Sequence, residues 1–449
     1  MTTAYAPPTH PTFAEQCDAL VKGLGRAMQW ARERTLDEEP LRSACLECLV
    51  YDLQCEDHRD QWLWNLITAA GLRDRLRPAM LASLDDLRPG YDATPQQRCG
   101  LAMRYAQAGD EAFRDRLYEI VRTVPLDADA IDGGDRTLGV EEVVRLDGLD
   151  GMVAISDSLV ERTDDDDLAC LLRHLASLLF ADDESADGRL LTALQEAGGD
   201  AQRLADRWEA ANREETPKPP APPITDDRPL AERAIAEAHG EPGSRLSHAE
   251  WRDDATPADA RLILDAAFAT DDLPIVRKLL MRYRWVRERP FDRRLLTLAD
   301  LPDRFTQARA WSVLREVRHP KIRAIAERGL QAPESDRHWL DALHANFLPG
   351  DEPRIEAAMT RWQPSVPPGD GGDRHGLLFG VLSVLERNEH ADVDALATRA
   401  YFETPCTNCR RRAAVLLRDR GTPPDWLVAE TAEDCDESVR RVFTGDTGD

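Results

Sequence analysis

Hydrophobic residues recur at steps of three and four along almost the whole chain, the spacing of amphipathic helices. Between residues 13 and 34, apolar side chains such as Leu20, Leu24 and Met28 share one helical stripe. Similar segments, separated by Pro, Gly or Asp, cover roughly 41–50, 61–71, 73–87, 95–108, 110–123, 150–162, 166–181, 187–198, 200–213, 230–239, 258–270, 272–285, 303–317, 320–330, 336–346, 351–362, 374–388, 392–402, 405–420, 424–433 and 436–443. No segment alternates convincingly at the two-residue period of a strand. The pattern therefore predicts an all-α protein.

A proline-rich stretch divides the chain. Residues 214–229 include prolines at 217, 219, 220, 222 and 223, which remove backbone donors and favour an extended spacer. We therefore expect a disordered N-terminus over 1–12, an N-terminal helical repeat domain over 13–213, a linker over 214–229 and a C-terminal helical repeat domain over 230–449.

Several predicted helices begin in the same way, with a break residue, then an apolar residue, then an arginine. Asp or Pro suits a helix start, and the arginine is placed to reach acidic groups of a neighbouring hairpin. The five arginines of this signature are Arg42, Arg114, Arg277, Arg323 and Arg440.

This recurring start resembles the second helix of HEAT repeats, in which a cap, an apolar residue and an arginine recur from repeat to repeat. The resemblance implies an α-solenoid of stacked helical hairpins in two halves, and a surface that binds a partner protein. The spacing of the repeats is uneven, and residues 127–150 are expected to interrupt the array. The acidic stretch from Asp127 fails the EF-hand pattern, because Ile131, Asp132 and Leu138 occupy its required ligand and glycine positions.

Charge restricts the choice of partner. The chain of 449 residues carries 83 Asp and Glu against 57 Lys and Arg, a net charge of −26. Such a surface repels a phosphate backbone, so nucleic acid is disfavoured unless one face concentrates the arginines. A GC-rich, bacterial-type genome would also account for the preference for arginine over lysine. With no apolar stretch of membrane-spanning length and no signal-peptide pattern, we expect no membrane contact and a cytoplasmic location.

Standard catalytic motifs are missing from the sequence, including the phosphate-binding loop, the nucleophile elbow and the zinc-protease helix. Gly23-Leu-Gly25 has no preceding strand and no third glycine, so it indicates no nucleotide site. The prediction is a protein without catalytic activity.

Two groups of cysteines have the spacing of soft metal ligands. Cys45, Cys48, Cys55 and His58 lie within one short stretch, although Cys45 and Cys48 fall on an apolar stripe where cysteine commonly packs as a small hydrophobe.

The second group is Cys406-Thr-Asn-Cys409, which opens a predicted helix after Pro405. A helix N-terminus lowers the pKa of a thiol, which suits metal binding or redox chemistry. No second pair of this kind follows, and no histidine lies within twenty residues downstream, so a structural role is favoured over an active one.

The sequence favours a protein-binding scaffold, adaptor or regulatory subunit without a cofactor. The main alternative is a zinc-bearing or thiol-based regulatory protein that uses one of the cysteine groups. A hydrolase whose site assembles between helices is a third hypothesis. The identity of the partner protein and the oligomeric state are not encoded in any recognisable motif.

Overall fold

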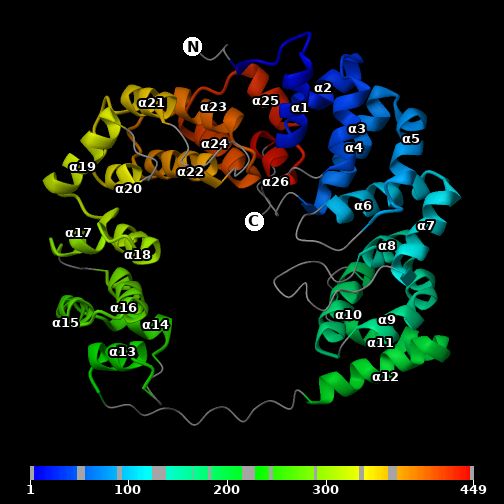
Figure 1. Ribbon diagram of the computed structural model, residues 1–449, viewed down its shortest axis with the longest axis horizontal. Helices are drawn as coiled ribbons and strands as arrows, with labels where there is room; N and C mark the ends of the chain where they lie inside the picture. The colour runs from blue at the N-terminus through cyan, green and yellow to red at the C-terminus, as the bar shows by residue number, and fades with distance from the viewer. Residues whose placement is uncertain are drawn as a thin grey trace. The chain divides into compact units, whose positions relative to one another are not determined.

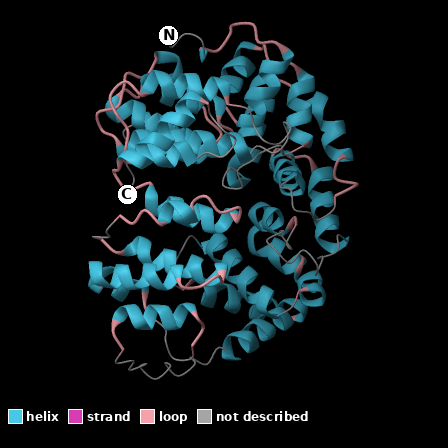
Figure 2. Cartoon of the chain, turned by 60° about the vertical axis from the view of Figure 1, so that its left-hand side comes forward, coloured by secondary structure: helices cyan, strands magenta, loops and turns pink. Residues whose placement is uncertain are grey.

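The computed structural model describes residues 5–47, 56–87, 94–123, 138–163, 165–180, 183, 185–214, 228–241, 246–287, 291–332, 338–362 and 372–444. Within these ranges every regular element is a helix (Figures 1 and 2). The prediction of an all-α chain is confirmed for this part. None of its helices is long and apolar enough to cross a membrane.

Most helices follow the predicted segments, whereas the short helices over 248–254 and 295–298 lie outside them. In the first half they are α1 (Phe13–Lys22), α2 (Arg26–Glu33), α3 (Glu38–Leu46), α4 (Glu56–Ala70), α5 (Arg73–Ala82), α6 (Thr94–Gln107), α7 (Glu111–Thr123), α8 (Val140–Ala154), α9 (Ser156–Arg162), α10 (Asp165–Phe180), α11 (Ala186–Ala197) and α12 (Gly199–Glu214). In the second half they are α13 (Leu230–Ala238), α14 (His248–Asp254), α15 (Pro257–Phe268), α16 (Leu273–Trp285), α17 (Leu295–Leu298), α18 (Arg304–Leu314), α19 (Pro320–Gln331), α20 (His338–His344), α21 (Glu352–Arg361), α22 (Gly372–Arg387), α23 (Asp394–Glu403), α24 (Thr407–Arg420), α25 (Asp425–Thr431), α26 (Glu437–Arg440) and the 3-10 helix η3 (Arg441–Phe443).

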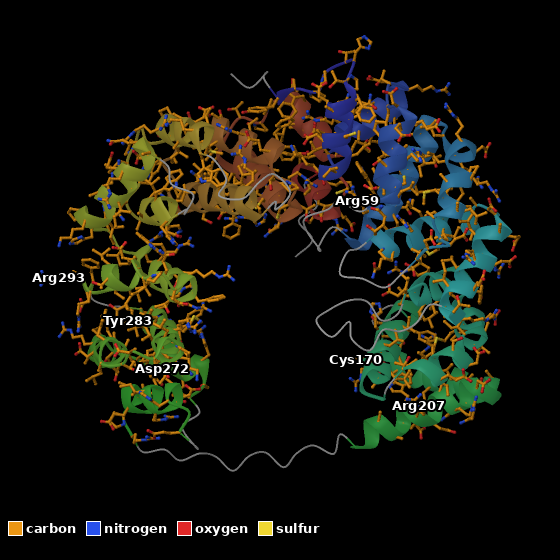
Figure 3. All side chains as sticks on the ribbon, in the orientation of Figure 1. Arg59, Cys170, Arg207, Asp272, Tyr283 and Arg293 are labelled. Atoms are coloured by element: carbon orange, nitrogen blue, oxygen red, sulfur yellow. The ribbon has the colours of Figure 1, made fainter. Side chains whose placement is uncertain are left out.

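The predicted capping explains where many helices begin. The Asp272 side chain accepts a hydrogen bond from the Ile275 amide at the start of α16, a helix that also carries the buried Tyr283 (Figure 3). Asp436 caps α26 in the same way, and Thr256 forms a capping box at α15. These bonds satisfy amide donors that a helix leaves unpaired in its first turn.

The structure departs from the predicted helices in a few places. The stretch expected to be one helix over 13–34 is two helices, because Gly23 ends α1 in the left-handed region at a φ of 73°. Residues 140–150 belong to α8, which packs on α6, α7 and α10. The expected interruption over 127–150 is therefore wrong for its second part, and its first part, up to residue 137, lies outside the described residues.

The chain divides into two compact units. Unit 1 comprises Met1–Pro217, Tyr401–Arg418 and Thr422–Asp449, and unit 2 comprises Lys218–Ala400 with Asp419–Gly421. The first division falls inside the predicted linker, of which residues 215–227 lie outside the described part. The predicted C-terminal domain over 230–449 differs from this arrangement, because its last segments pack with the N-terminal half.

Helices in unit 1 follow two rows. In one row α1 contacts α3 and α3 contacts α5; in the other α2, α4, α6, α8, α10 and α12 contact one another in that order. Neighbours across the rows also touch, as α1 and α2 or α5 and α6 do. The apolar stripe of each helix is buried between the rows, for example through Leu63 and Leu66 of α4.

Unit 2 repeats this kind of packing. Helices α16, α18, α20 and α22 contact one another in sequence, while α15 packs on α16 and α19 packs on both α20 and α21. Trp251, Trp311, Trp339 and Trp362 are buried between helices. A Cβ atom at Gly329 of α19 would overlap Trp339 of α20, so this glycine allows the two helices their close approach.

Residues 5–12 lie against α2 and the C-terminal segment of unit 1. The Trp30 indole donates to the Pro8 carbonyl at 3.0 Å, and the Tyr5 ring centroid lies 5.0 Å from that of Phe402. The expectation of a disordered N-terminus differs from this finding for residues 5–12, while residues 1–4 lie outside the described part.

Candidate functional site

The first candidate site is a buried ion network in unit 1, where the C-terminal helices meet α1 and α2. Arg26 pairs with Glu430 at 2.7 Å, and Arg410 makes two bonds of 2.9 and 3.0 Å to Asp434. The Arg26 guanidinium also lies over the Phe402 ring, 4.8 Å from its centroid. These pairs join residues that are as many as 404 positions apart in the chain.

The glycines of Gly23-Leu-Gly25 give the C-terminal segment room to approach. A Cβ atom at Gly25 would overlap the backbone carbonyl of Glu430, and one at Gly23 would overlap the Cys435 sulfur. The Cys435 amide donates to the Gly23 carbonyl at 3.0 Å. These glycines form no nucleotide site motif in the sequence, and in the structure they have a packing role.

Burial raises the pKa values of the two acidic groups in this network. Desolvation raises the pKa of Glu430 to about 7, although Arg26 acts in the opposite direction, and burial also raises the pKa of Asp434. Perturbed groups often mark functional sites. Here, however, the side chains of Glu430, Arg410 and Asp434 are 0% exposed, so no solute reaches them. We interpret the network as structural.

This pKa shift makes the stability of unit 1 depend on pH. The Glu430 carboxyl keeps its proton up to about pH 7 in the folded chain, whereas in the unfolded chain it has the ordinary glutamate pKa of 4.5. Folding therefore binds a proton between these values, and the Glu430 contribution to stability falls as pH rises from about 4.5 to about 7, by at most about 3 kcal/mol. Urea unfolding followed by circular dichroism should show a shallower decline for Glu430→Gln. Identical pH profiles for the two proteins would contradict this.

The second candidate site is an open cleft in unit 2, over α18, α20 and α22. It has a volume of about 600 Å³. Its polar and charged lining is unusual for an acidic protein, because it includes three histidines and two arginines. The lining side chains include Arg304, Gln307, Ser312, Arg315, His338, Asp341, His344, His375, Phe379 and Ser383.

Two of the histidines come from α20. His338 stacks on Trp311, with ring centroids 5.2 Å apart, and its Nδ1 lies 3.4 Å from an Asp341 carboxylate oxygen. Burial, followed by the positive charge of Arg315, lowers the pKa of His344. The lowered pKa of His344 favours its neutral form. The cleft also contains the guanidinium groups of Arg304 and Arg315.

A second hollow of about 620 Å³ adjoins the cleft in the same unit. It is lined by Arg284, Trp285, Arg287, Phe291, Glu316, Val317 and Arg387. Glu316 links the two hollows, because its carboxylate lies 3.5 Å from His344, 3.6 Å from Arg315 and 3.9 Å from Arg387. We call the two hollows together the basic groove. Five arginines line it, against the carboxylates of Glu316 and Asp341.

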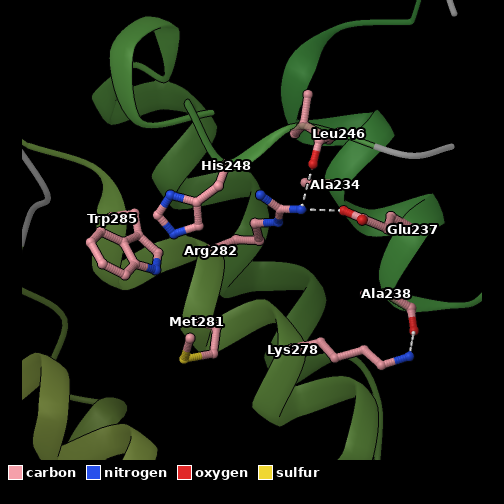
Figure 4. Close-up of a pocket in the computed structure, with 9 residues that line it drawn as sticks. All are labelled: Ala234, Glu237, Ala238, Leu246, His248, Lys278, Met281, Arg282 and Trp285. Atoms are coloured by element: carbon pink, nitrogen blue, oxygen red, sulfur yellow. Dashed lines mark hydrogen bonds and ion pairs between the residues drawn. The ribbon is translucent and has the colours of Figure 1, made fainter. Parts of the chain in front are cut away.

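A third hollow of about 440 Å³ lies between α13, α14 and α16 (Figure 4). Its polar groups are already engaged. Arg282 donates to the Leu246 carbonyl at 2.9 Å and pairs with Glu237 at 2.5 Å, and Lys278 donates to the Ala238 carbonyl. The His248 ring meets Trp285 edge-on at 4.2 Å. These internal pairs make it a weaker candidate than the basic groove.

The structure describes only part of the first cysteine group. Cys45 is buried in α3, and burial raises the pKa of its thiol to about 12, which favours the protonated form over a metal-binding thiolate. Cys48, Cys55 and the side chain of His58 lie outside the described residues. Zinc at this group stays a sequence prediction.

The second cysteine group is buried at the start of α24 in unit 1. Cys409 donates its amide hydrogen to the Cys406 sulfur at 3.4 Å, which is the local geometry of a helix N-terminus. Such a bond stabilises negative charge on sulfur. The prediction of metal or redox chemistry at Cys406 and Cys409 therefore also stays open.

Two of the five signature arginines reach acidic groups beyond their own helix, as proposed from the sequence. Arg114 of α7 pairs with Asp147 of α8 at 2.7 Å. Arg323 of α19 donates to Asp351, at the start of α21, at 2.9 Å, and also to the Asn346 carbonyl. Each of these arginines joins its own helix to a later helix of the same unit.

The other three signature arginines have different partners. Arg42 pairs with Glu39 of its own helix, and the Arg277 guanidinium lies 5.6 Å from the centroid of the Phe305 ring of α18. Arg440 donates to the backbone carbonyls of Asp434 and Cys435. The shared sequence signature thus does not impose one shared contact.

A more regular bridge exists that the sequence analysis missed. Arg77 of α5 pairs with Asp110, and Arg114 of α7 pairs with Asp147; in both pairs the aspartate follows its arginine by 33 residues. The residue before each arginine, Leu76 or Phe113, is buried. The same bridge therefore recurs between successive hairpins of unit 1.

The basic groove was also missed. The spacing of His338, Asp341 and His344 at every third residue of α20 was a usable signal, since such residues share a helix face. Nothing in the sequence links them to Arg387 or Arg284. The class that fold and groove define is an all-helical protein with a basic groove in one of its two units. No family model, curated protein or solved structure matches this chain.

Proposed function

We propose that this chain is a HEAT-like α-solenoid scaffold or adaptor, and that it binds a partner protein through the basic groove of unit 2. The proposal assigns no catalytic step to the chain. The single observation that carries it is the groove itself, an open, arginine-lined surface over three successive helices of one row.

The repeat character rests on three features. Alternate helices contact one another in each unit, which is the packing expected when hairpins stack side by side. The Arg77 and Arg114 bridges recur at the same spacing. Buried tryptophans and the close approach at Gly329 join successive helices of unit 2.

The groove suits binding better than hydrolysis. The hydroxyl groups of Ser312 and Ser383 donate to the carbonyls of Arg309 and Phe379, so their protons point into their own helices. A serine nucleophile instead needs its proton directed at a base. Exposed arginines with aromatic neighbours are the side chains that contribute most binding energy at protein interfaces.

Affinity capture from the native host tests this proposal. The wild-type chain should retain a stoichiometric protein partner, and Arg287→Glu with Arg387→Glu should lose it, because both changes reverse charge in the groove. The control is Arg42→Glu with Arg441→Glu, which makes the same change in net charge on exposed arginines of unit 1. The control should keep the partner. Absence of any retained protein, or equal retention by the groove variant, would contradict the proposal.

A further inference from the structure

We infer that the segment recognised by the basic groove is an acidic peptide, rich in aspartate or glutamate. This inference rests on the proposed function and adds the chemistry of the partner. It starts from a contrast: the chain carries a net charge of −26, yet arginines outnumber carboxylates in the groove by five to two.

Three of the five arginines are placed where a ligand reaches them. Arg287 and Arg304 are exposed, and the Arg387 side chain is 56% exposed and lies 3.9 Å from a Glu316 carboxylate oxygen. Arginine binds a carboxylate through two parallel N–H groups, which strengthens the pairing and fixes the orientation of the carboxylate. Glu316 of the second hollow contacts Arg315 and His344 of the first, so the two hollows are neighbours. Arginines spread over two neighbouring hollows suit an extended segment better than a single small anion.

The groove also offers apolar contact. Phe379 of α22 is 41% exposed beside the histidines, and Trp285 and Phe291 line the second hollow. Aromatic side chains supply large contact areas at interfaces. A peptide whose carboxylates alternate with apolar residues matches this lining.

Charge outside the groove argues against a nucleic acid. A nucleic-acid strand carries a negative charge at every nucleotide and extends beyond a short binding site. Beyond the groove it would meet a chain whose carboxylates outnumber its basic residues by 83 to 57. A short acidic peptide can keep all of its negative charge within the groove, so it avoids the repulsion that a longer nucleic-acid strand would meet outside it.

Fluorescence anisotropy with the purified full-length chain tests the inference. The probe is a short fluorescein-labelled peptide of alternating glutamate and alanine, compared with the same peptide carrying glutamine and with a single-stranded DNA of similar length. The glutamate peptide should bind at least about tenfold more tightly than the glutamine peptide. Arg287→Gln with Arg387→Gln should remove at least about tenfold of that affinity, and Arg42→Gln with Arg441→Gln should leave it unchanged.

Three results would overturn the inference: equal binding of both peptides, no effect of the groove variant, or tighter binding of the DNA. Competition separates this inference from the proposed function. If a partner captured through the groove is not displaced by the glutamate peptide, the scaffold role stands and the acidic chemistry is wrong. If no partner is captured, the scaffold role itself fails.

Discussion

Replacing Arg410 with alanine should destabilise the chain by about 3–5 kcal/mol, because it leaves Asp434 buried without its cation. Arg410 and Asp434 are both 0% exposed and share two hydrogen bonds, and Arg410 also donates to the Pro405 carbonyl. Urea unfolding at pH 7 measures the loss. The destabilisation should be smaller at acidic pH, where the unpaired Asp434 carboxyl takes up a proton.

Arg42→Ala is the matched control, because it also removes one arginine from an ion pair. The Arg42 and Glu39 side chains are 40% and 58% exposed, so this change should cost less than about 1 kcal/mol. Adding Asp434→Leu to Arg410→Met should recover part of the loss, since no buried charge then remains. An Arg410→Ala effect no larger than that of Arg42→Ala would mean that the buried pair does not hold unit 1 together.

Replacing Gly25 with alanine should cost about 3 kcal/mol or more and should release the C-terminal segment of unit 1. The added methyl group would overlap the Glu430 carbonyl and come within 2.9 Å of the Glu433 carbonyl carbon, and backbone atoms cannot move aside as a flexible side chain can. Gly25 already has helical φ and ψ angles, so the effect comes from packing alone. Urea unfolding and limited proteolysis within 401–444 measure it.

Gly188→Ala provides the comparison. Gly188 lies within α11, and an added Cβ atom there meets nothing within 4 Å. Alanine should stabilise this helix by roughly 0.5–1 kcal/mol, because it restricts the unfolded backbone. The same substitution should thus change stability in opposite directions at Gly25, which precedes α2, and at Gly188 within α11. A neutral Gly25→Ala would contradict the close contact between α2 and the C-terminal segment.

The local pattern of the sequence was enough to predict most helices, although it did not predict the short helices α14 and α17. Apolar spacing and caps such as Asp272 act within a few residues, so they can be read directly from the chain. The pattern failed at α8, where an acidic turn-rich stretch before Val140 suggested a longer interruption than the structure has. It also joined α1 and α2 across Gly23, a left-handed residue that periodicity does not detect.

The division into units was not predictable in the same way. The proline-rich stretch marks one division, but the return of 401–418 and 422–444 to unit 1 depends on pairs such as Arg26 with Glu430. Neither residue is unusual in its local sequence. The pair is distinctive only because both side chains are buried, beside Gly23 and Gly25, which leave room for the C-terminal segment. Such burial depends on the three-dimensional fold and cannot be read from the local sequence.

The basic groove, too, could be predicted only in part from the sequence. One helix, α20, brings His338, Asp341 and His344 to the cleft at a spacing that can be read from the sequence. The arginines come from helices that are distant in the chain, with Arg284 on α16 and Arg387 on α22. The whole chain has a net charge of −26, and this total does not indicate that arginines outnumber carboxylates in the basic groove.

Hydrogen–deuterium exchange on the full chain, alone and in the complex recovered from its native host, tests the central claim most directly. Binding through the basic groove should slow exchange in α18, α20 and α22, at residues 304–314, 338–344 and 372–387, and should leave α5 to α7 of unit 1 unchanged. Protection confined to unit 1, or no protection of the groove helices, would contradict the account.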